Sequence, residues 1–522
     1  MALALAAVVW GPAAAEAQTQ QELDAAASSD DDWLLTNKDY AGRRFTNLRQ
    51  IDRRNVAKLK PVCTWQSNVE APSQTSPIVY KGIMYVTVGY LTAAVDGASC
   101  KELWRHVWTP TAKELSNPNR GAALKDGKLL RGTPDGNLIA LDTATGKVLW
   151  SKQIASPKDN HYLSQQPVVV DDLVIIGTAG ADFGSRGWLG AFKLENGDEV
   201  WKFYVVPQAG EPGAETWSDP KVLPHGGGSF WTPLSLDREK GVLYAPAGNP
   251  APDFYGEVRE GPNLYTNAAV ALDVKTGKVL WRQQFVPHDV HDWDLTQVSP
   301  LLTVEAKGKK RDIVIVSGKD ALLRGVDRDT HEQLYEVAIS TRKNTATPLT
   351  VKGVHVCPGL LGGQEWSTAG YSPALGLIFT PSVEWCGRAA KLEKPPAYQV
   401  GEHYRGGSFT QDPPAKAKGW LTAIDPASGK VRWKYNSKSP MLANVTATAG
   451  DLVLTGTMRG EFVALDARSG KLLYRHPVGG AATGGVVTYA VKGKQYVAVE
   501  AGRVSVFFGG AGPATFTVFA LP

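Results

Sequence analysis

The chain has 522 residues, of which 54 are glycine and 33 are proline, and 43% are hydrophobic against 20% charged. This balance excludes a disordered chain and predicts a globular protein with many turns. The net charge of +5 is spread along the chain, and the longest basic run is the triplet at 309–311. A nucleic-acid-binding protein is therefore not expected.

Residues 1–17 are predicted to form a signal peptide. Ala2 to Trp10 is an apolar run, and Ala-Glu-Ala before Gln18 has the small-residue pattern of a signal-peptidase site. No basic residue precedes the apolar run, so the signal is expected to be truncated; a short disordered tail rich in alanine is the alternative. The rest of the sequence has no apolar run long enough to span a membrane. We expect an exported, periplasmic protein.

The four cysteines, Cys63, Cys100, Cys357 and Cys386, have neither CxxC nor CxxCH spacing. A zinc ribbon and a covalently attached c-type haem are therefore not encoded, and any electron acceptor must be a separate molecule. In an oxidising compartment an even count indicates two disulfides. Pairing of neighbours, Cys63 with Cys100 and Cys357 with Cys386, is the favoured one of three connectivities, and free buried thiols are the alternative.

A short motif recurs seven times along the chain. It consists of a small residue, an Asp two positions later in most copies, a Gly in most copies and a final aromatic residue, and apolar alternating runs flank it. This pattern predicts a strand, an Asp/Gly turn and a second strand. The copies begin at Ala94, Ala140, Ala191, Ala271, Gly325, Ala423 and Ala464.

The copies start 46, 51, 80, 54, 98 and 41 residues apart, which is close to one four-stranded propeller blade with two lengthened intervals. Residues 480–522 hold about three more strands without the motif, and a strand from the N-terminal region would complete that blade. We therefore expect an all-β fold over residues 30–522, a single eight-bladed β-propeller in which the aromatic residues lie between blades. A seven-bladed ring is the alternative.

The repeat Ala-Leu-Asp-x-x-Thr-Gly-Lys-Val-Leu-Trp resembles the tryptophan-docking motif of the alcohol dehydrogenases that depend on pyrroloquinoline quinone (PQQ). The similarity runs from Trp33 to Pro522. Its most specific parts are the insertions Asn-Arg-Gly at 119–121, Gly-Ala-Asp-Phe-Gly at 180–184, Gly-Asn-Pro-Ala-Pro at 248–252 and Pro-His-Asp at 287–289 with Asp292.

The resemblance implies a cation site. Asn249 and Asp292 match metal ligands, and Asp182 stands where the family has a longer Glu. Asp294 matches an additional Asp of relatives that use a lanthanide. Oxygen ligands of this kind suit hard cations. Ca²⁺ is the expected ion and a lanthanide ion the alternative.

The resemblance also implies a PQQ site. Arg120 matches a residue that binds a PQQ carboxylate, a fork that Lys cannot reproduce. Trp231 matches the tryptophan that stacks on the ring system, and Lys319 a cation beside the quinone oxygens. The other expected cofactor contacts are Gln74, Ser164, Gly180, Ala181, Asp182 and Ser229. A core Trp, a solvated Lys and surface serines are the alternatives for those residue types.

The resemblance implies oxidation of an alcohol. Asp292 would accept the alcohol proton while hydride passes to PQQ, and Lys319 would stabilise the oxyanion that develops. Electrons would leave to an external c-type cytochrome or another acceptor.

Several positions depart from the family pattern and are expected to line the mouth of the site. Glu114 and Leu115 replace a vicinal disulfide, Gln74 an acid, Glu365 an Asn, and Leu442 a Trp. They favour an alcohol larger than methanol, possibly secondary. Two other functions stay open: a non-catalytic propeller scaffold with a decayed site, and a nicotinamide dehydrogenase, although no helix pattern follows the glycines at 177–184.

Overall fold

The computed structural model describes residues 17–522, and most of the predicted signal peptide, residues 1–16, lies outside this range. Within it the chain is almost entirely β-structure, with one α-helix, α1 (Gln20–Asp24). The 3-10 helices are η1 (Val56–Lys58), η2 (Pro157–Asp159), η3 (Ala181–Phe183), η4 (Ala214–Thr216), η5 (Pro220–His225), η6 (Gly256–Val258) and η7 (Pro414–Lys416).

Residues 17–522 form nine sheets, and eight of them have four or five strands, the number of sheets that an eight-bladed ring requires. The first four sheets are β3 (Ile78–Tyr80), β4 (Ile83–Val88), β5 (Leu91–Asp96), β6 (Glu102–Val107); β7 (Ala123–Lys125), β8 (Lys128–Gly132), β9 (Asn137–Asp142), β10 (Val148–Gln153); β11 (Val168–Val170), β12 (Leu173–Gly177), β13 (Trp188–Lys193), β14 (Glu199–Tyr204); and β15 (Ser235–Asp237), β16 (Val242–Pro246), β17 (Ala268–Asp273), β18 (Val279–Gln284).

The next three are β19 (Leu295–Gln297), β21 (Lys309–Gly318), β22 (Leu322–Asp327), β23 (Gln333–Ala338), with β20 (Leu301–Ala306) beside β21; β25 (Gly370–Ser372), β26 (Leu377–Glu384), β29 (Lys418–Ile424), β30 (Val431–Ser437); and β31 (Thr446–Thr448), β32 (Leu452–Thr457), β33 (Glu461–Asp466), β34 (Leu472–Pro477), extended by β1 (Phe45–Thr46). The eighth is β35 (Val486–Val491), β36 (Lys494–Ala501), β37 (Thr515–Ala520) and β2 (Lys60–Gln66). A small sheet of β24 (Val354–Val356), β27 (Gly387–Lys391) and β28 (Gly407–Gln411) belongs to the long insertions around the sixth sheet.

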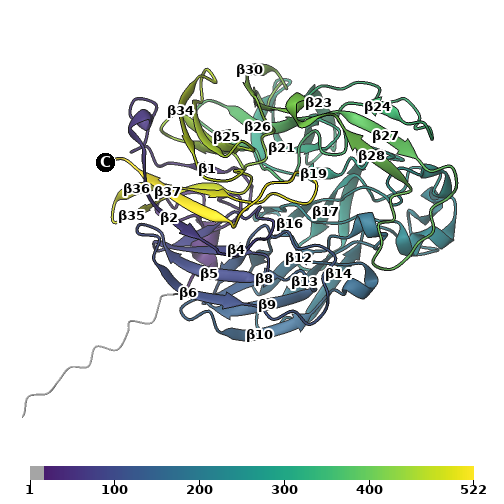
Figure 1. Cartoon of the computed structure of the whole chain (residues 1–522), viewed down its shortest axis with the longest axis horizontal. Coiled ribbons are helices and arrows are strands. Elements are labelled where there is room, and N and C mark those ends of the chain that lie inside the picture. The colour runs from purple at the N-terminus through teal and green to yellow at the C-terminus, as the bar shows by residue number, and fades with distance from the viewer. Residues whose placement is uncertain (1–16) are drawn as a thin grey trace, which may run out of the picture.

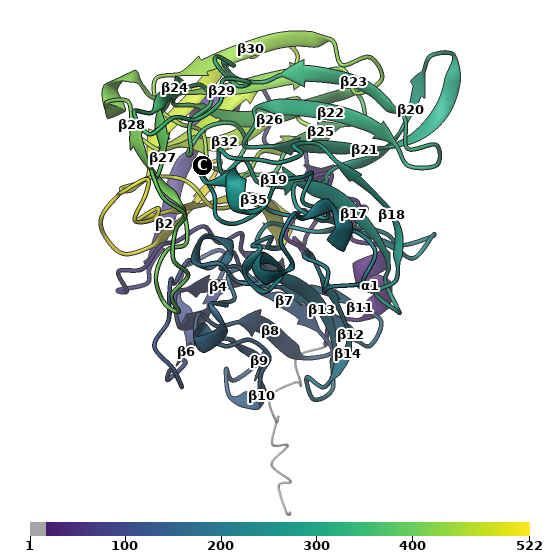
Figure 2. The same ribbon diagram turned by 90° about the vertical axis from the view of Figure 1, so that its right-hand side faces the viewer.

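The sheets follow one another around the molecule in chain order (Figure 1). The colour passes from purple through blue and teal to green and returns in yellow beside the start (Figure 1). In the side view the hairpin of β20 and β21 projects from the body (Figure 2). The predicted all-β propeller fold is confirmed. The packed fold also begins before residue 30, because Leu23 of α1 is buried in the main hydrophobic cluster.

The repeated motif forms the expected hairpin in every copy. In β9 and β10, Ala140 pairs with Trp150 across a shift in register, and the amide of Gly146 donates to the Asp142 carbonyl over 2.8 Å. The small residue pairs with the aromatic residue in the other six copies as well. The turn needs a left-handed residue, which Gly146 supplies at φ 70°.

The aromatic residue of one motif packs on the glycine of the next. A Cβ atom at Gly146 would lie 2.5 Å from the Trp104 ring of the preceding sheet. The Trp104 indole also donates to the Thr143 carbonyl over 2.9 Å. The same contact joins Trp433 to Gly470, where a Cβ would again lie 2.5 Å from the ring. A side chain at this glycine would therefore push neighbouring sheets apart.

The N-terminal segment closes the ring. Strand β2 pairs antiparallel with β37 and so supplies the fourth strand of the eighth sheet, as the sequence predicts. Upstream, the fully buried Arg44 donates to the carbonyl of Val445 over 3.0 Å and to that of Val486 over 2.9 Å. One side chain thus ties the chain start to the seventh and eighth sheets.

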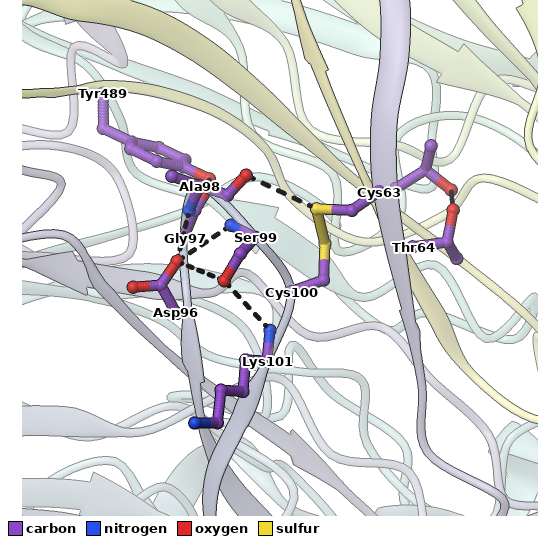
Figure 3. Close-up of a disulfide and its surroundings, with 10 residues drawn as sticks. Cys63, Thr64, Asp96, Gly97, Ala98, Ser99, Cys100, Lys101 and Tyr489 are labelled. Carbon is purple, nitrogen blue, oxygen red and sulfur yellow. Dashed lines mark hydrogen bonds between the residues drawn. A yellow bond between two sulfur atoms is a disulfide. The ribbon is translucent and has the colours of Figure 1, made fainter.

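Both favoured disulfides, Cys63–Cys100 and Cys357–Cys386, are present, and none of the cysteines is free. Cys63 lies on β2, the closing strand, and Cys100 lies in the turn between β5 and β6 of the first sheet (Figure 3). The first bond therefore holds the last sheet of the ring to the first. The second lies within the insertions around the sixth sheet.

We expect Cys63→Ser/Cys100→Ser to lower the midpoint of urea unfolding. A crosslink that encloses 37 residues restricts the unfolded chain, and its loss costs about 2–4 kcal/mol. The comparison variant, Cys357→Ser/Cys386→Ser, opens a loop of 29 residues and should lower the midpoint by a similar amount, but it should also speed proteolysis of residues 340–419, where this bond lies. An unchanged midpoint in the first variant would contradict a role for this bond in closing the ring.

Candidate functional site

A cavity of about 470 Å³ lies where loops from several sheets converge. The predicted site residues that line it are Gln74, Arg120, Gly180, Ala181, Asp182, Ser229, Trp231, Asp292, Asp294 and Lys319. Two others, Ser164 and Asn249, lie behind this lining and contact Arg120 and Asp294. Gln74 and Lys319, which are 245 positions apart in the sequence, thus line the same cavity.

Asp182 is presented by a short loop after β12. Gly180 begins η3 at φ 125°, and a Cβ there would lie 1.9 Å from the Asn160 carbonyl oxygen, so only glycine fits. The Asn160 amide donates to the Phe183 carbonyl over 2.6 Å and holds the other end of the turn. The loop therefore fixes Asp182 at the cavity wall.

Asp292 lies in the loop before β19, which a second carboxylate shapes. Asp289 accepts hydrogen bonds from the backbone amides of His291 over 2.9 Å and Trp293 over 2.7 Å. His288 contacts the Gly261 carbonyl at 3.0 Å. The acidic loop thus uses Asp289 and His288 to hold its backbone and leaves Asp292 free to face the cavity.

The loop after β16 carries Asn249 and a residue that the sequence did not single out, Asp253. The Asn249 side-chain amide donates to Asp253 Oδ1 over 3.0 Å, and the Asn249 backbone amide donates to Asp294 Oδ1, also over 3.0 Å. The only feature of the sequence that could have indicated Asp253 is its position, four residues after Asn249 in a proline-rich loop. The resemblance assigns no ligand there.

Asp182, Asp253 and Asp292 offer carboxylate oxygens that lie within 4.8 Å of one another. Asp253 is fully buried and Asp292 is 4% exposed. Three oxygens in this region, Asn249 Oδ1, Asp253 Oδ2 and Asp292 Oδ1, are buried and accept no hydrogen bond. Buried carboxylates with free oxygens fit a hard cation, which prefers oxygen ligands.

Lys319 follows β21 and supplies positive charge beside the carboxylates. Its ammonium lies 2.7 Å from Asp294 Oδ2 and 3.5 Å from Asp292 Oδ1. Asp294 is thus already bound by Lys319 and by the Asn249 amide, whereas Asp292 keeps an oxygen that accepts no hydrogen bond.

The carboxylates differ in electrostatics. Burial raises the pKa of Asp253 well above its usual value, and the charge of Asp182 raises it further. Burial also raises the pKa of Asp292, which Lys319 only partly offsets. For Asp182, the charges of Arg405 and Lys319 outweigh burial and lower the pKa. Of the three carboxylates, Asp182 thus has a lowered pKa and the two more deeply buried ones have raised pKa values.

Arg120 and Trp231 form another wall of the cavity. The buried Arg120 donates to the Ser164 hydroxyl over 2.8 Å, and its guanidinium carbon lies 4.5 Å from the centre of the Trp231 ring. The Lys319 ammonium lies 5.6 Å from the same ring. Two cations beside one indole ring suit a flat, anionic molecule.

The mouth of the cavity is lined partly by irregular loops that have no recognisable sequence motif. Of the positions that depart from the family pattern, Gln74, Glu114, Leu115 and Glu365 line the cavity as expected. The expectation for Leu442 is wrong. It is fully buried in a hydrophobic cluster with Phe254 and Trp366, because its neighbours on that strand connection face the packed interior.

Further lining residues come from the insertions and from the C-terminal loop. They are Leu360, Leu361, Trp366, His403, Arg405 and the run Ser505 to Phe508. Arg405 Nη2 lies 3.2 Å from Asp182 Oδ2, and its Nε lies 3.8 Å from Asp253 Oδ2. Its guanidinium also lies 5.0 Å from the Phe507 ring. These contacts link the mouth to the carboxylate group.

Comparison with known proteins agrees with this geometry. Residues 33–343 match the family described as the glucose/ethanol/alcohol dehydrogenase β-propeller domain, and residues 417–509 match the outer membrane protein assembly factor BamB. The structure of BamB from Moraxella catarrhalis is 15% identical, with a TM-score of 0.52 over 88% of this chain and 99% of that one. That likeness shows the fold alone.

Closer relatives are alcohol dehydrogenases. Quinohemoprotein alcohol dehydrogenase ADH IIB of Pseudomonas putida is 31% identical over 90% of this chain and 73% of its own length. The dehydrogenase subunit of a quinone alcohol dehydrogenase from Acetobacter aceti is 32% identical over 96% and 76%. A europium-containing methanol dehydrogenase structure is 26% identical, with a TM-score of 0.88 over 96% of this chain and all of that one.

The converging acids, the cation-flanked indole and these likenesses together show that the chain belongs to the family of PQQ-dependent quinoprotein alcohol dehydrogenases.

Proposed function

We propose that the protein oxidises an alcohol larger than methanol, primary or secondary, to an aldehyde or ketone with PQQ and a bound cation. The observation that carries this proposal is the convergence of Asp182 and Asp292 in one acidic group, with Lys319 at 3.5 Å from Asp292. A propeller that only bound other proteins would have no need to bury such a group, because unpaired buried carboxylates are costly.

The cation would be held by Asp182, Asn249 and Asp292, with Asp294 at the edge of the group. All four offer oxygen atoms, as Ca²⁺ and lanthanide ions require. Asp294 is the least available of them, since Lys319 and the Asn249 amide already bind its two oxygens. Ca²⁺ is the ion that the resemblance favours.

PQQ would lie against Trp231, with its carboxylates near Arg120. Ser164 holds the Arg120 guanidinium, and Ser229, Gly180 and Ala181 complete the wall without bulky side chains. Gln74 donates to the Val504 carbonyl over 3.2 Å and keeps its own oxygen free toward the cavity region. Each of these contacts orients a flat polyanion rather than taking part in chemistry.

Asp292 would act as the general base. When bound, PQQ supplies the two-electron oxidant and the cation supplies a Lewis acid. A carboxylate has two oxygens, so Asp292 could contact the cation through one of them and take the alcohol proton with the other. The Lys319 ammonium, 3.5 Å from Asp292 Oδ1, stabilises its negative charge and any oxyanion that develops beside it.

The mouth favours an alcohol with an apolar body. Leu115, Leu361 and Phe507 line the cavity, and Phe507 is 41% exposed. These side chains offer apolar surface without closing the entrance.

We propose that electrons pass to a separate acceptor, such as a c-type cytochrome; within residues 17–522 all four cysteines are used in disulfides. We propose that the protein is exported to the periplasm, which the two disulfides and the Ala-Glu-Ala site before Gln18 support. In residues 17–522, no helix is long and apolar enough to cross a membrane.

Apo-protein mixed with PQQ and Ca²⁺ should gain dye-linked alcohol oxidation, and Asp292→Asn should lower its kcat by about 10²–10⁴ because the base is lost. Asp329→Asn, which removes a surface carboxylate paired with Lys240, is the control and should keep full activity. If wild type gains no activity with Ca²⁺ or a light lanthanide on primary and bulky secondary alcohols, the scaffold function replaces this proposal.

The affinity for PQQ should fall as the pH rises through neutrality. Burial raises the pKa of Glu365 to about 7, so this cavity residue is neutral below that pH and negative above it, where it repels the PQQ carboxylates. Glu365→Gln should remove the dependence. Quenching of tryptophan fluorescence by PQQ between pH 5.5 and 8.5, with Ca²⁺ present, measures it. An equal slope in both proteins would exclude Glu365 as its source.

Arg120→Lys should weaken PQQ binding at least tenfold while leaving Ca²⁺ binding unchanged, because Lys keeps the charge but loses the fork. Fluorescence titration with PQQ and calorimetry with Ca²⁺ separate the two effects. Unchanged PQQ affinity would place the carboxylate contact elsewhere.

A further inference from the structure

We propose that Asp253 is a direct ligand of the cation, in addition to the ligands that the family pattern assigns. This inference rests on the proposed function for the presence of a cation and adds a residue to its site. Asp253 lies four residues after Asn249 in the loop that follows β16.

The first argument is position. A carboxylate oxygen of Asp253 lies within 4.8 Å of oxygens from both Asp182 and Asp292. The three side chains come from loops after β12, after β16 and before β19, so three neighbouring parts of the ring deliver them to one point. Asp294 is not part of this group of three, and Lys319 binds it instead.

The second argument is that a buried carboxylate oxygen of Asp253 accepts no hydrogen bond. Asp253 is fully buried, and its Oδ1 accepts from the Asn249 amide while its Oδ2 accepts no hydrogen bond. Asn249 Oδ1 and Asp292 Oδ1, also buried, accept none either. Buried oxygens in native proteins nearly always have partners, so several unpaired ones at one site indicate a missing positive group.

The third argument is that Asp182 and Asp253 already face a common positive charge. Arg405 Nη2 lies 3.2 Å from Asp182 Oδ2, and Arg405 Nε lies 3.8 Å from Asp253 Oδ2. One guanidinium cannot neutralise two carboxylates, so negative charge remains on the pair for a cation to offset. Arg405 lies toward the cavity mouth, where it contacts Phe507.

Asp253 can also compensate for the short side chain of Asp182. Asp182 is one methylene shorter than the family's Glu, which puts its bidentate reach in doubt. A second carboxylate from the Asn249 loop restores the oxygen that the shorter side chain gives up. With Asp182 and Asp292 it brings three carboxylates to the ion, and a trivalent ion gains more from the third charge than Ca²⁺ does.

The test is Asp253→Asn, which keeps size and removes charge. Full-length metal-free protein without PQQ is titrated with Tb³⁺, followed by luminescence excited through tryptophan, and then with Ca²⁺ in competition. We expect Tb³⁺ affinity to fall at least tenfold and Ca²⁺ affinity to fall less. In Asp253→Ser, whose hydroxyl is too short to replace the ligand oxygen, luminescence lifetimes in H₂O and D₂O should show about one more water on the ion.

Glu365→Gln at pH 8 is the matched control, since it removes another buried cavity carboxylate that lies outside the group of three. It should leave the count of bound water unchanged. Asp253→Ser, which shortens the side chain, supplies the water count and also the affinity if the Asn variant does not fold. Wild-type affinity in the Asp253 variants and an unchanged water count in Asp253→Ser would overturn the proposal.

The outcomes separate this proposal from the proposed function. If Asp253→Asn loses Tb³⁺ while wild type with PQQ oxidises no alcohol, the ligand assignment stands and the enzymatic function fails. If wild type is an active dehydrogenase and the Asp253 variants bind Tb³⁺ normally, the reverse holds. A wild type that binds neither ion would overturn both.

Discussion

Repulsion between buried carboxylates is the constraint on which this structure depends. Asp182, Asp253 and Asp292 are held with oxygens within 4.8 Å of one another, and two of them are almost completely shielded from water. Left alone they would move apart or take up protons. They stay together because each is fixed by a stiff loop on a closed ring of sheets, and a cation would convert their repulsion into binding energy.

The ring supplies that stiffness through two devices. Between most neighbouring sheets the aromatic residue of one motif packs on the glycine of the next motif, as Trp104 does on Gly146, and Trp281 packs on His331 in the same position. At the seam, β2 pairs with β37 while the Cys63–Cys100 bond joins the last sheet to the first. The site loops are inserted between these contacts, so they can be long and specialised without loosening the frame.

The arrangement separates holding from reacting. Some side chains only hold their neighbours in place. Asp289 and Asn160 form hydrogen bonds with the backbone, and Ser164 accepts a hydrogen bond from Arg120. Asp292 Oδ1 accepts no hydrogen bond, and the Lys319 ammonium, paired with Asp294, lies beside the Trp231 ring. Preorganised charges of this kind act without rearrangement when a substrate arrives.

Much of the architecture was readable from the order of residues, because a repeat carries its own local chemistry. The Asp/Gly turn, the paired aromatic residue and the strands of 480–522 follow from short-range patterns, and the spacing of the cysteines favoured one of three pairings. Site residues such as Arg120 and Trp231 were expected only because the sequence resembles a known family. Other features depended on long-range contacts that no local pattern encodes: the place of Asp253 beside Asp292, the reach of Arg405 from an irregular insertion, and the burial of Leu442 away from the mouth. Residue spacing along the chain determines turns and hairpins, but only the closed ring determines which distant charged side chains lie next to one another.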